Sequence, residues 1–288
     1  MTTDGKNIYP DEKARCRFWT EYMDRGYELV QSMSNYEVKE CGEGVVSIPE
    51  AAEKAGVKML FSETKIAGDL DRIFIIRESL IPDLLAIARD MKERGWILKI
   101  EDSYRSHEMQ TQLGRKPEVF DMIVRSCWRE NGGVPPPLDL VKKRSMCLIA
   151  NYPYSGTHLM AAAVDISVFR IDDGSEVSRG KPYLEMSEYT PMDCPFVNAE
   201  EHHNRMDITT LMERHGFLHF PGEFWHYNKG DALYQIYKRS GEPGCYGPIH
   251  WDPQTGEIRP FDDITSPLTP SHLLAGNLQQ ALKRMKLG

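Results

Sequence analysis

The hydrophobic pattern of the chain changes its period at Gly95. From Ser79 up to that glycine, apolar residues recur at mostly three- and four-residue steps, which predicts a helix that ends at Gly95. Residues Trp96–Arg105 then alternate as a strand does, which places Arg105 at a strand end. A second alternating stretch, Ala163–Phe169, predicts a strand from which Asp165 projects. Helices and strands therefore mix without a strict alternation, and the sequence favours an α+β fold.

Other segments also show sequence patterns that are typical of helices, loops or strands. The motif Ser47-Ile-Pro-Glu50 is typical of a helix start, and GGVPPPL at Gly132–Leu138 is typical of a loop between two helical stretches. The aromatic segment Phe217–Tyr227 and the short segment Leu233–Tyr237 are expected to be strands. The first third of the chain is expected to be mostly helical. Helical spacing predicts further helices at Asp11–Ser34, His107–Leu113, Val119–Trp128, Asn204–His215 and Ser271–Lys286.

Composition excludes some classes of protein. The chain has 288 residues, of which 41% are hydrophobic and 27% charged, as in an ordinary folded globular protein. Its formal net charge is −8, and it contains no Lys/Arg block long enough to neutralise a row of phosphates. We therefore expect no nucleic-acid partner.

The positions of the charged residues and the cysteines also indicate in which cellular compartment we expect the protein. The N-terminal sequence carries charged residues from the start and lacks the apolar stretch of roughly 7–15 residues that a signal peptide needs. The longest stretch without acidic or basic residues, Ser145–Val164, is interrupted by Asn151 and Pro153, so no membrane span is expected. The six cysteines form no C-x-x-C pair, which favours reduced thiols. A cytoplasmic protein without a membrane partner is the expectation.

His158 and Asp165 form the first candidate metal site. A neutral imidazole nitrogen and a carboxylate oxygen are both good zinc ligands, and the two residues could approach one ion if the chain turns between them. Spacing alone leaves another interpretation open, in which His158 lies in a loop and Asp165 caps a strand end.

Glu223 and His226 form the second candidate, within the aromatic segment. His226 could add a further metal ligand, and Glu223 a carboxylate that binds water rather than metal. In a flat strand these two residues would point to opposite faces, so a twist or bulge must bring them together. The alternative is an aromatic core strand with polar residues at its rim.

Three other positions have simpler explanations than metal binding. Adjacent residues point in different directions, so His202-His203 is expected to be a solvated polar turn outside the site. His219 is expected to be a hydrogen-bonded histidine at the edge of the core. Trp225 is expected to be a packing wall beside the site.

Taken together, the two candidate segments resemble the signature of the zinc D-Ala-D-Ala dipeptidases. This family belongs to the group that joins lysostaphin-type peptidases, D-Ala-D-Ala metallopeptidases and the hedgehog signalling domain. Its signature is Ser-x-His-x-x-Gly-x-Ala-x-Asp, followed several tens of residues later by Glu-x-Trp-His, after a strand ending in Tyr-Arg. Similar pieces also occur at Tyr189–Phe196, Asn204-Arg205 and Leu211–Phe217, and the resemblance spans Ile97–Tyr237. In the same order this chain has Tyr104, Arg105, His158, Ala163, Asp165, Glu223, Trp225 and His226.

The resemblance implies a zinc metallopeptidase site. His158, Asp165 and His226 would hold one zinc ion per chain, leaving the fourth tetrahedral position for water. Glu223 would be the general base that takes the proton of the water and returns it to the leaving amine. Arg105 would stabilise the developing oxyanion. Without the order of the motifs, a surface salt bridge would be the simpler interpretation of Arg105.

The chain departs from the family signature at two positions. Gly156 replaces the serine, a position that in the dipeptidases is associated with holding the amino terminus of the substrate. Ser155 or Thr157 could compensate. Ala161 replaces the glycine, which implies that the backbone there needs no positive φ or that the loop runs differently. The metal chemistry is compatible with both changes, whereas the identity of the substrate is not fixed.

The resemblance also implies a fold and a division of the chain. The expected fold is α+β, with a small central antiparallel sheet that carries the zinc site and is flanked by helices, as in the hedgehog and D,D-peptidase group. Residues 1–95 are expected to form a mainly helical N-terminal extension, 96–245 the peptidase core and 246–288 a C-terminal extension. All three are expected to pack into one compact unit.

The expected function is zinc-dependent hydrolysis of a short D-amino-acid peptide, with D-Ala-D-Ala as the first choice. Three alternatives stay open: a D,D-carboxypeptidase or wall-peptide endopeptidase, a metal enzyme acting on another small amide or metabolite, and a non-catalytic zinc-binding domain. The presence of both Glu223 and Arg105 favours turnover, since a structural zinc site needs no general base. The expected partner is a short peptide or small amide, and the sequence does not indicate an oligomeric state.

Overall fold

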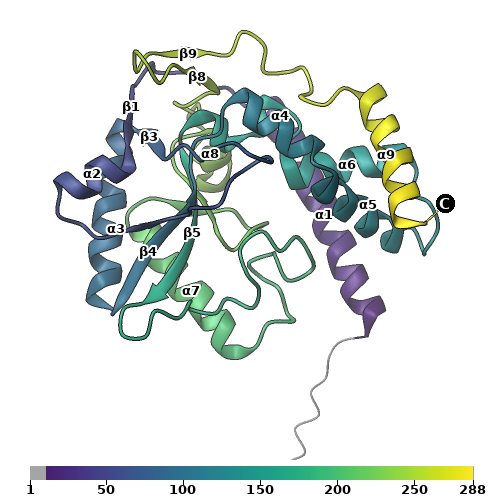
Figure 1. The fold of residues 1–288 in the computed structure, drawn as a ribbon, viewed down its shortest axis with the longest axis horizontal. Helices are drawn as coiled ribbons and strands as arrows, with labels where there is room; N and C mark the ends of the chain where they lie inside the picture. The colour runs from purple at the N-terminus through teal and green to yellow at the C-terminus, as the bar shows by residue number, and fades with distance from the viewer. Residues whose placement is uncertain (1–10, 288) are drawn as a thin grey trace, which may run out of the picture.

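The structure is a computed structural model that describes residues 11–287. It places a sheet and its covering helices beside a second group of helices, and each of these parts has its own hydrophobic core (Figure 1). Within the described range, no helix combines the length and the apolar composition needed to cross a lipid bilayer.

The central sheet is mixed. Its five strands lie in the order β2 (Leu60–Phe61), β4 (Trp96–Asp102), β5 (Ala163–Arg170), β7 (His226–Asn228) and β6 (Leu218–His219). The predicted strands β4 and β5 are confirmed. The expectation of an antiparallel sheet is wrong at one edge, where β2 runs parallel to β4. A long crossover that contains α3 (Ile81–Glu93) separates these two strands, and such a connection permits parallel pairing.

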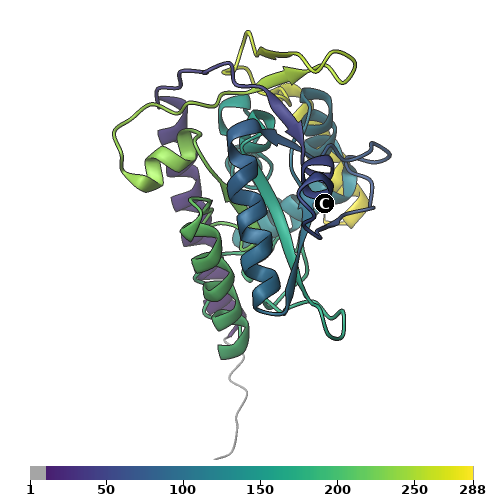
Figure 2. The same ribbon diagram turned by 90° about the vertical axis from the view of Figure 1, so that its left-hand side faces the viewer.

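The two faces of β5 differ in chemistry. Val164, Ile166 and Val168 belong to the fully buried core under α3 and α7 (Ala199–Arg214). Figure 2 shows these two helices side by side over the sheet. Because side chains alternate along a strand, Asp165 projects from the opposite face.

A β-bulge at the end of β4 changes which way its side chains face. Ile100 pairs with Ile166, but Asp102 pairs with Asp165, so Glu101 is the extra residue. Without this shift Asp102 would share the core face with Ile100. With it, Asp102 and Asp165 lie opposite each other on the same face of the sheet.

The second part of the molecule is helical (Figure 1). Asp11 and Ser106 accept backbone hydrogen bonds at the first turns of two of its helices, and Pro117 starts a third. The predicted helices in this part are confirmed, and all of the predicted loop at Gly132–Leu138 except its last residue lies between α5 and α6. The helices are α1 (Glu12–Ser34), α4 (His107–Arg115), α5 (Pro117–Glu130), α6 (Leu138–Ile149) and α9 (Ser271–Met285).

Two of the predicted strands are wrong. The segment Phe217–Tyr227 is not one strand but β6, a turn and β7. The segment Leu233–Tyr237 lies in α8 (Ala232–Lys238), because the Asp231 carboxylate accepts the Tyr234 N–H and so caps a helix start. The helix predicted at Asn204–His215 is confirmed as α7 but begins earlier, at Ala199, since Asn198 and Glu201 form a capping box before it.

Short elements complete the fold. β1 (Val45–Ser47) pairs with β3 (Ile75–Arg77), and α2 (Ile48–Lys54) begins at the Ser47 cap as predicted. Within residues 11–95, the chain therefore contains three short strands and is less helical than predicted. β8 (Ile249–Trp251) and β9 (Ile258–Pro260) form a hairpin near the C-terminus. The division into residues 1–95, 96–245 and 246–288 stays a prediction. β2 belongs to the central sheet, although it lies in the segment 1–95 and not in the predicted core 96–245.

Candidate metal centre

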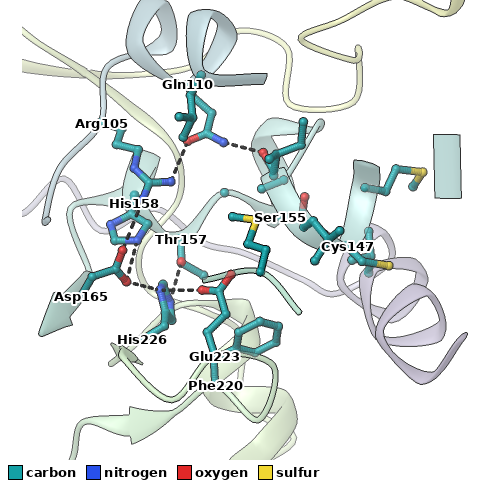
Figure 3. Close-up of a pocket in the computed structure, with 18 of the residues that line it drawn as sticks. Arg105, Gln110, Cys147, Ser155, Thr157, His158, Asp165, Phe220, Glu223 and His226 are labelled. Atoms are coloured by element: carbon teal, nitrogen blue, oxygen red, sulfur yellow. Dashed lines mark hydrogen bonds and ion pairs between the residues drawn. The ribbon is translucent and has the colours of Figure 1, made fainter. Parts of the chain in front are cut away.

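Three predicted site residues come together on the polar face of the sheet. Asp165 lies in β5 and pairs in register with His226, the first residue of β7. His158 lies in a short 3-10 turn, Thr157–Met160, that precedes β5. One nitrogen or oxygen atom of each residue lies within 4.8 Å of the others, and all three residues are buried. They are therefore arranged as a set of ligands for one metal ion, as Figure 3 shows.

The hydrogen bond on the far side of the His158 ring fixes its tautomer. His158 Nδ1 contacts the carbonyl oxygen of Ser103, and a carbonyl can only accept, so this nitrogen carries the hydrogen. The lone pair of neutral His158 is then on Nε2, which lies 3.2 Å from Asp165 Oδ1. Metal-binding histidines commonly donate their other N–H to a carbonyl in this way.

His226 faces the same carboxylate oxygen. Its Nδ1 lies 2.9 Å from Asp165 Oδ1, and its Nε2 lies 3.0 Å from Thr157 Oγ1. Burial opposes ionisation of Asp165, but His158 and then His226 hold the pKa of that carboxyl well below its usual value. A negatively charged oxygen thus lies between two imidazoles inside the protein.

The donor set fits a divalent metal ion. When His158 is neutral, with its hydrogen on Nδ1, its Nε2 directs a lone pair at Asp165 Oδ1, and a metal cation would satisfy both acceptors. When His226 donates from Nε2 to the Thr157 hydroxyl, its Nδ1 adds a third lone pair. Two imidazoles and one carboxylate are typical zinc ligands.

Glu223 reaches the site from the turn between β6 and β7. Its backbone N–H donates to the carbonyl of Phe220 over 3.1 Å, and its own carbonyl accepts the N–H of His226 over 3.1 Å. This tight turn resolves the conflict with strand alternation, because Glu223 is not in a strand. Its Oε2 lies 3.9 Å from His226 Nδ1.

The Glu223 carboxyl can hold a proton near neutral pH. Burial raises its pKa to about 7, with His226 opposing and Asp165 reinforcing the shift. A carboxyl with this pKa can exchange protons in both directions at neutral pH, as a general base that later acts as an acid must.

Arg105 lies at the edge of the metal centre, three residues past the last residue of β4. Its Nε donates to Asp102 over 2.7 Å, and Nη2 and Nη1 donate to Asp165 and Gln110, each over 3.3 Å. Burial opposes the positive charge, but Asp102 and Asp165 raise the pKa of the guanidinium above its usual value. Arg105 is thus a fixed cation and not a surface salt bridge.

Two supporting residues were not predicted. The Tyr183 hydroxyl donates to Asp165 Oδ2 over 2.9 Å from the long segment between β5 and α7. Gln110 accepts from Arg105 and donates to the carbonyl of Ile149, so it links α4 to α6 beside the site. Tyr183 lies in a segment without periodicity. Gln110 lies in the first turn of the predicted helix His107–Leu113, five residues after Arg105, a signal that could have identified it.

The two departures from the family signature have different outcomes. Gly156 lines the site without a side chain, beside Ser155 and Thr157. Ala161 has a φ of +51°, so the backbone retains the left-handed conformation that glycine adopts easily. The expectation that alanine removes the need for a positive φ is therefore wrong.

The remaining predicted positions lie as expected outside the ligand set. His202 and His203 are exposed on α7, which is a helix rather than the turn that was expected. His219 pairs with Glu213, 2.6 Å away. Trp225 is buried and lines the cavity beside the site.

The metal centre opens into a cavity of about 140 Å³. Arg105, Asp165, His158, His226 and Glu223 line one end, and Cys147 and Ser155 lie on the other side of the space (Figure 3). The cavity is bounded by the sheet and by the helical part, which contributes residues of α1, α4, α5 and α6. Its size suits a small molecule rather than a protein chain.

Comparison with known proteins relates this region to one family. Residues 61–240 match the family described as D-Ala-D-Ala dipeptidase. The D-alanyl-D-alanine dipeptidase of Enterococcus faecium is 27% identical over 99 residues, which make up 34% of this chain and 48% of that protein. The D-alanyl-D-alanine dipeptidase of Synechocystis is 31% identical over 87 residues, 27% of this chain and 35% of that protein. The chain thus spans about half or less of the length of these curated relatives.

Solved structures give a more distant likeness. A mutant of a vancomycin-resistance D,D-pentapeptidase, in complex with Zn(II), aligns with 64% of this chain and 94% of its own. The sequence identity is 17% and the TM-score 0.35, a score that does not establish a shared fold.

Proposed function

This chain belongs to the D-Ala-D-Ala dipeptidase family, and from that premise we propose that it is a zinc peptidase that hydrolyses a short D-amino-acid peptide of the D-Ala-D-Ala class. One observation supports the proposal above all. His158, Asp165 and His226 converge within 4.8 Å, with Glu223 and Arg105 at the same end of one cavity. A structural zinc site would need neither of the last two residues, so the arrangement favours catalysis over a binding domain.

His158, Asp165 and His226 would hold the zinc ion, through the atoms that face one another in the structure, His158 Nε2, Asp165 Oδ1 and His226 Nδ1. When bound, zinc supplies Lewis-acid chemistry, in which it acidifies a water molecule and polarises the scissile carbonyl. The protein keeps these ligands oriented through bonds behind them, from Ser103 to His158, from Thr157 to His226 and from Tyr183 to Asp165.

Glu223 moves the proton. In its ionised form, its carboxylate accepts a proton from the attacking water, and the protonated carboxyl then donates that proton to the nitrogen of the leaving amine. A pKa of about 7 suits both steps. The turn from Phe220 to His226 holds the carboxylate beside the ligands, so little reorganisation is needed.

Arg105 stabilises the charge that develops on the carbonyl oxygen of the peptide. Three of its five N–H groups are directed at Asp102, Gln110 and Asp165, which leaves two for the substrate. Because the carboxylates hold the guanidinium in place, these donors are preorganised, which is the property that makes oxyanion stabilisation effective.

The test compares zinc-loaded wild type with Glu223→Gln for release of free alanine from D-Ala-D-Ala. We expect the variant to bind zinc normally and to lose roughly 10²- to 10⁴-fold in kcat, because its amide cannot accept the proton. Glu213→Gln is the matched control, since Glu213 pairs with His219 outside the ligand set. Undiminished release by Glu223→Gln would remove Glu223 from the mechanism.

The same assay separates the alternatives. Release from longer peptides ending in D-Ala-D-Ala, but not from the dipeptide, would favour a D,D-carboxypeptidase. Absence of release from every peptide by zinc-loaded protein would reject the peptidase proposal in favour of another amide or a binding role. Equal release from the L,L dipeptide would reject a preference for D-amino acids.

A further inference from the structure

The cavity continues from the candidate metal centre into a region where none of the lining residues, among those that the structure describes, is charged. We name this region the apolar chamber and define it by Val30, Met33, Leu113, Met122, Met146 and Ile149. These residues come from α1, α4, α5 and α6. Val30, Met33, Met146 and Ile149 are each less than a tenth exposed. The chamber is thus an apolar recess inside the helical part that opens onto catalytic groups.

All acidic and basic side chains that line the cavity lie at its other end. They are Arg105, Asp165 and Glu223, with the two histidines beside them. A dipeptide carries an ammonium and a carboxylate at opposite ends, and a charge placed in the chamber would have no partner there. The charged termini must therefore lie near the metal centre or at the mouth, and an uncharged part of the substrate enters the chamber.

Leu184 connects the cavity to the surface. It lines the cavity, is 41% exposed and has a φ of +66°, a backbone conformation that leucine rarely adopts. Its neighbour Tyr183 bonds to Asp165, so the same loop contacts the metal ligand and borders the entrance. Strained residues of this kind are concentrated at ligand-binding sites.

The size of the cavity limits what can enter. The volume of about 140 Å³ is shared between the end beside the predicted ligands and the apolar chamber. A methyl group is too small to contact all six chamber side chains, which come from four helices, and apolar groups without a packing partner forfeit those contacts. A branched aliphatic or phenyl side chain matches the chamber better.

We propose that the substrate of this site is a D,D-dipeptide in which one residue has a bulky apolar side chain, such as D-Leu or D-Phe, and that this side chain occupies the apolar chamber. The inference rests on the proposed function. Part of the chamber wall comes from α1, at Glu12–Ser34, which lies before the region matched to the dipeptidase family. The wall that selects the side chain is therefore partly outside the segment that carries the family likeness.

The experiment measures kcat/KM of the zinc-loaded full chain for D-Ala-D-Ala, D-Ala-D-Leu, D-Leu-D-Ala, D-Ala-D-Phe and D-Phe-D-Ala. We expect at least one of the four larger peptides to exceed D-Ala-D-Ala about tenfold or more, because one methylene in an apolar pocket is worth roughly 10- to 200-fold. Equal or better turnover of D-Ala-D-Ala would overturn the inference and leave the proposed function standing. No turnover of any of the five would overturn the proposed function, and the inference with it.

Two variants localise the effect. Met122→Trp and Val30→Phe fill the chamber from α5 and α1, and each should lower the kcat/KM ratio of the preferred peptide to D-Ala-D-Ala about tenfold. Met206→Trp is the control, since Met206 is 43% exposed on α7, and it should leave the ratio unchanged. Circular dichroism identifies any variant that does not fold, and an unchanged ratio in either folded chamber variant would overturn the assignment of the chamber.

Discussion

Asp102 and Asp165 lie opposite each other across β4 and β5, and both of their carboxylates accept hydrogen bonds from Arg105. Like charges at directly opposed positions of a sheet destabilise it. Here the guanidinium offsets the repulsion, and Arg72 adds a second cation 3.2 Å from Asp102. The pair of carboxylates therefore fixes the position of Arg105 at the edge of the cavity.

Asp102→Asn should weaken catalysis more than zinc binding. The change keeps the shape of the side chain but removes the charge that orients Arg105, and loss of such a supporting contact typically costs about 10–100-fold in activity. It also leaves Arg72 and Arg105 short of a buried partner, which should lower the free energy of unfolding by about 3–5 kcal/mol. Steady-state kinetics, zinc analysis and urea unfolding test both effects. Wild-type kinetics in the folded variant would show that Arg105 needs no such support.

His158→Ala should abolish most zinc binding, because it removes one of three ligands. Zinc at about 100 times its Kd should stabilise wild type by about 2.7 kcal/mol and the variant hardly at all. Metal analysis and thermal melting with and without zinc measure this. His219→Ala is the control, since His219 contacts Glu213 instead of the ligand set. Full zinc occupancy in a folded His158→Ala protein would contradict the ligand assignment.

Asp231→Asn should stabilise the folded protein relative to wild type by an amount that increases as pH rises. Burial raises the pKa of Asp231 to about 6, and its Oδ2 has no hydrogen-bond partner among residues 11–287. The folded state therefore binds the proton more tightly than the unfolded state, whose pKa is about 3.9, so wild type loses stability as pH rises from about 4 to 6.

An asparagine side chain does not titrate. The free energy of unfolding of the variant minus that of wild type should therefore increase by about 2–3 kcal/mol from about pH 4 to about pH 6 and stay level above it. Urea unfolding of the two zinc-free proteins at several pH values measures the difference. A difference that does not change with pH would show that the pKa of Asp231 is the same in the folded and unfolded proteins.

Ala161→Gly should cost less stability than Ala163→Gly. Both alanines are fully buried, but only Ala161 has a positive φ, at +51°. Relief of that conformation should favour glycine at position 161 by roughly 1–2 kcal/mol relative to position 163. Urea unfolding of the two variants gives the comparison directly, and equal losses would argue against strain at Ala161.

Periodicity predicted the elements whose side chains repeat over several turns or pleats. α3 and β5 were recognisable because their apolar residues face one core along the whole element. β2 has two residues, too few for any period, so its parallel pairing with β4 could not be foreseen. α8 has seven residues and an aromatic composition, and its start depends on the Asp231 cap rather than on a pattern.

The candidate site was predictable as a set of residue types but not as a geometry. The order of motifs named His158, Asp165, Glu223 and His226, whereas the turn that brings Glu223 beside His226 contradicts strand alternation. The bulge at Glu101 is a single inserted residue in β4 and has no sequence signature here. Tyr183 contacts Asp165 only because an aperiodic segment folds back over the sheet.

The cavity lies between the sheet with its adjoining turns, which carry the predicted ligands and Glu223, and helices that supply the apolar chamber. The residues assigned to hydrolysis and most of those proposed to select the substrate side chain therefore lie in different segments of the chain. A substitution on α1 or α5 can alter which side chain fits without displacing any group that touches the scissile bond. Such a layout lets one hydrolytic centre be adapted to new substrates by small changes in α1 and α5, which carry none of the residues assigned to the reaction.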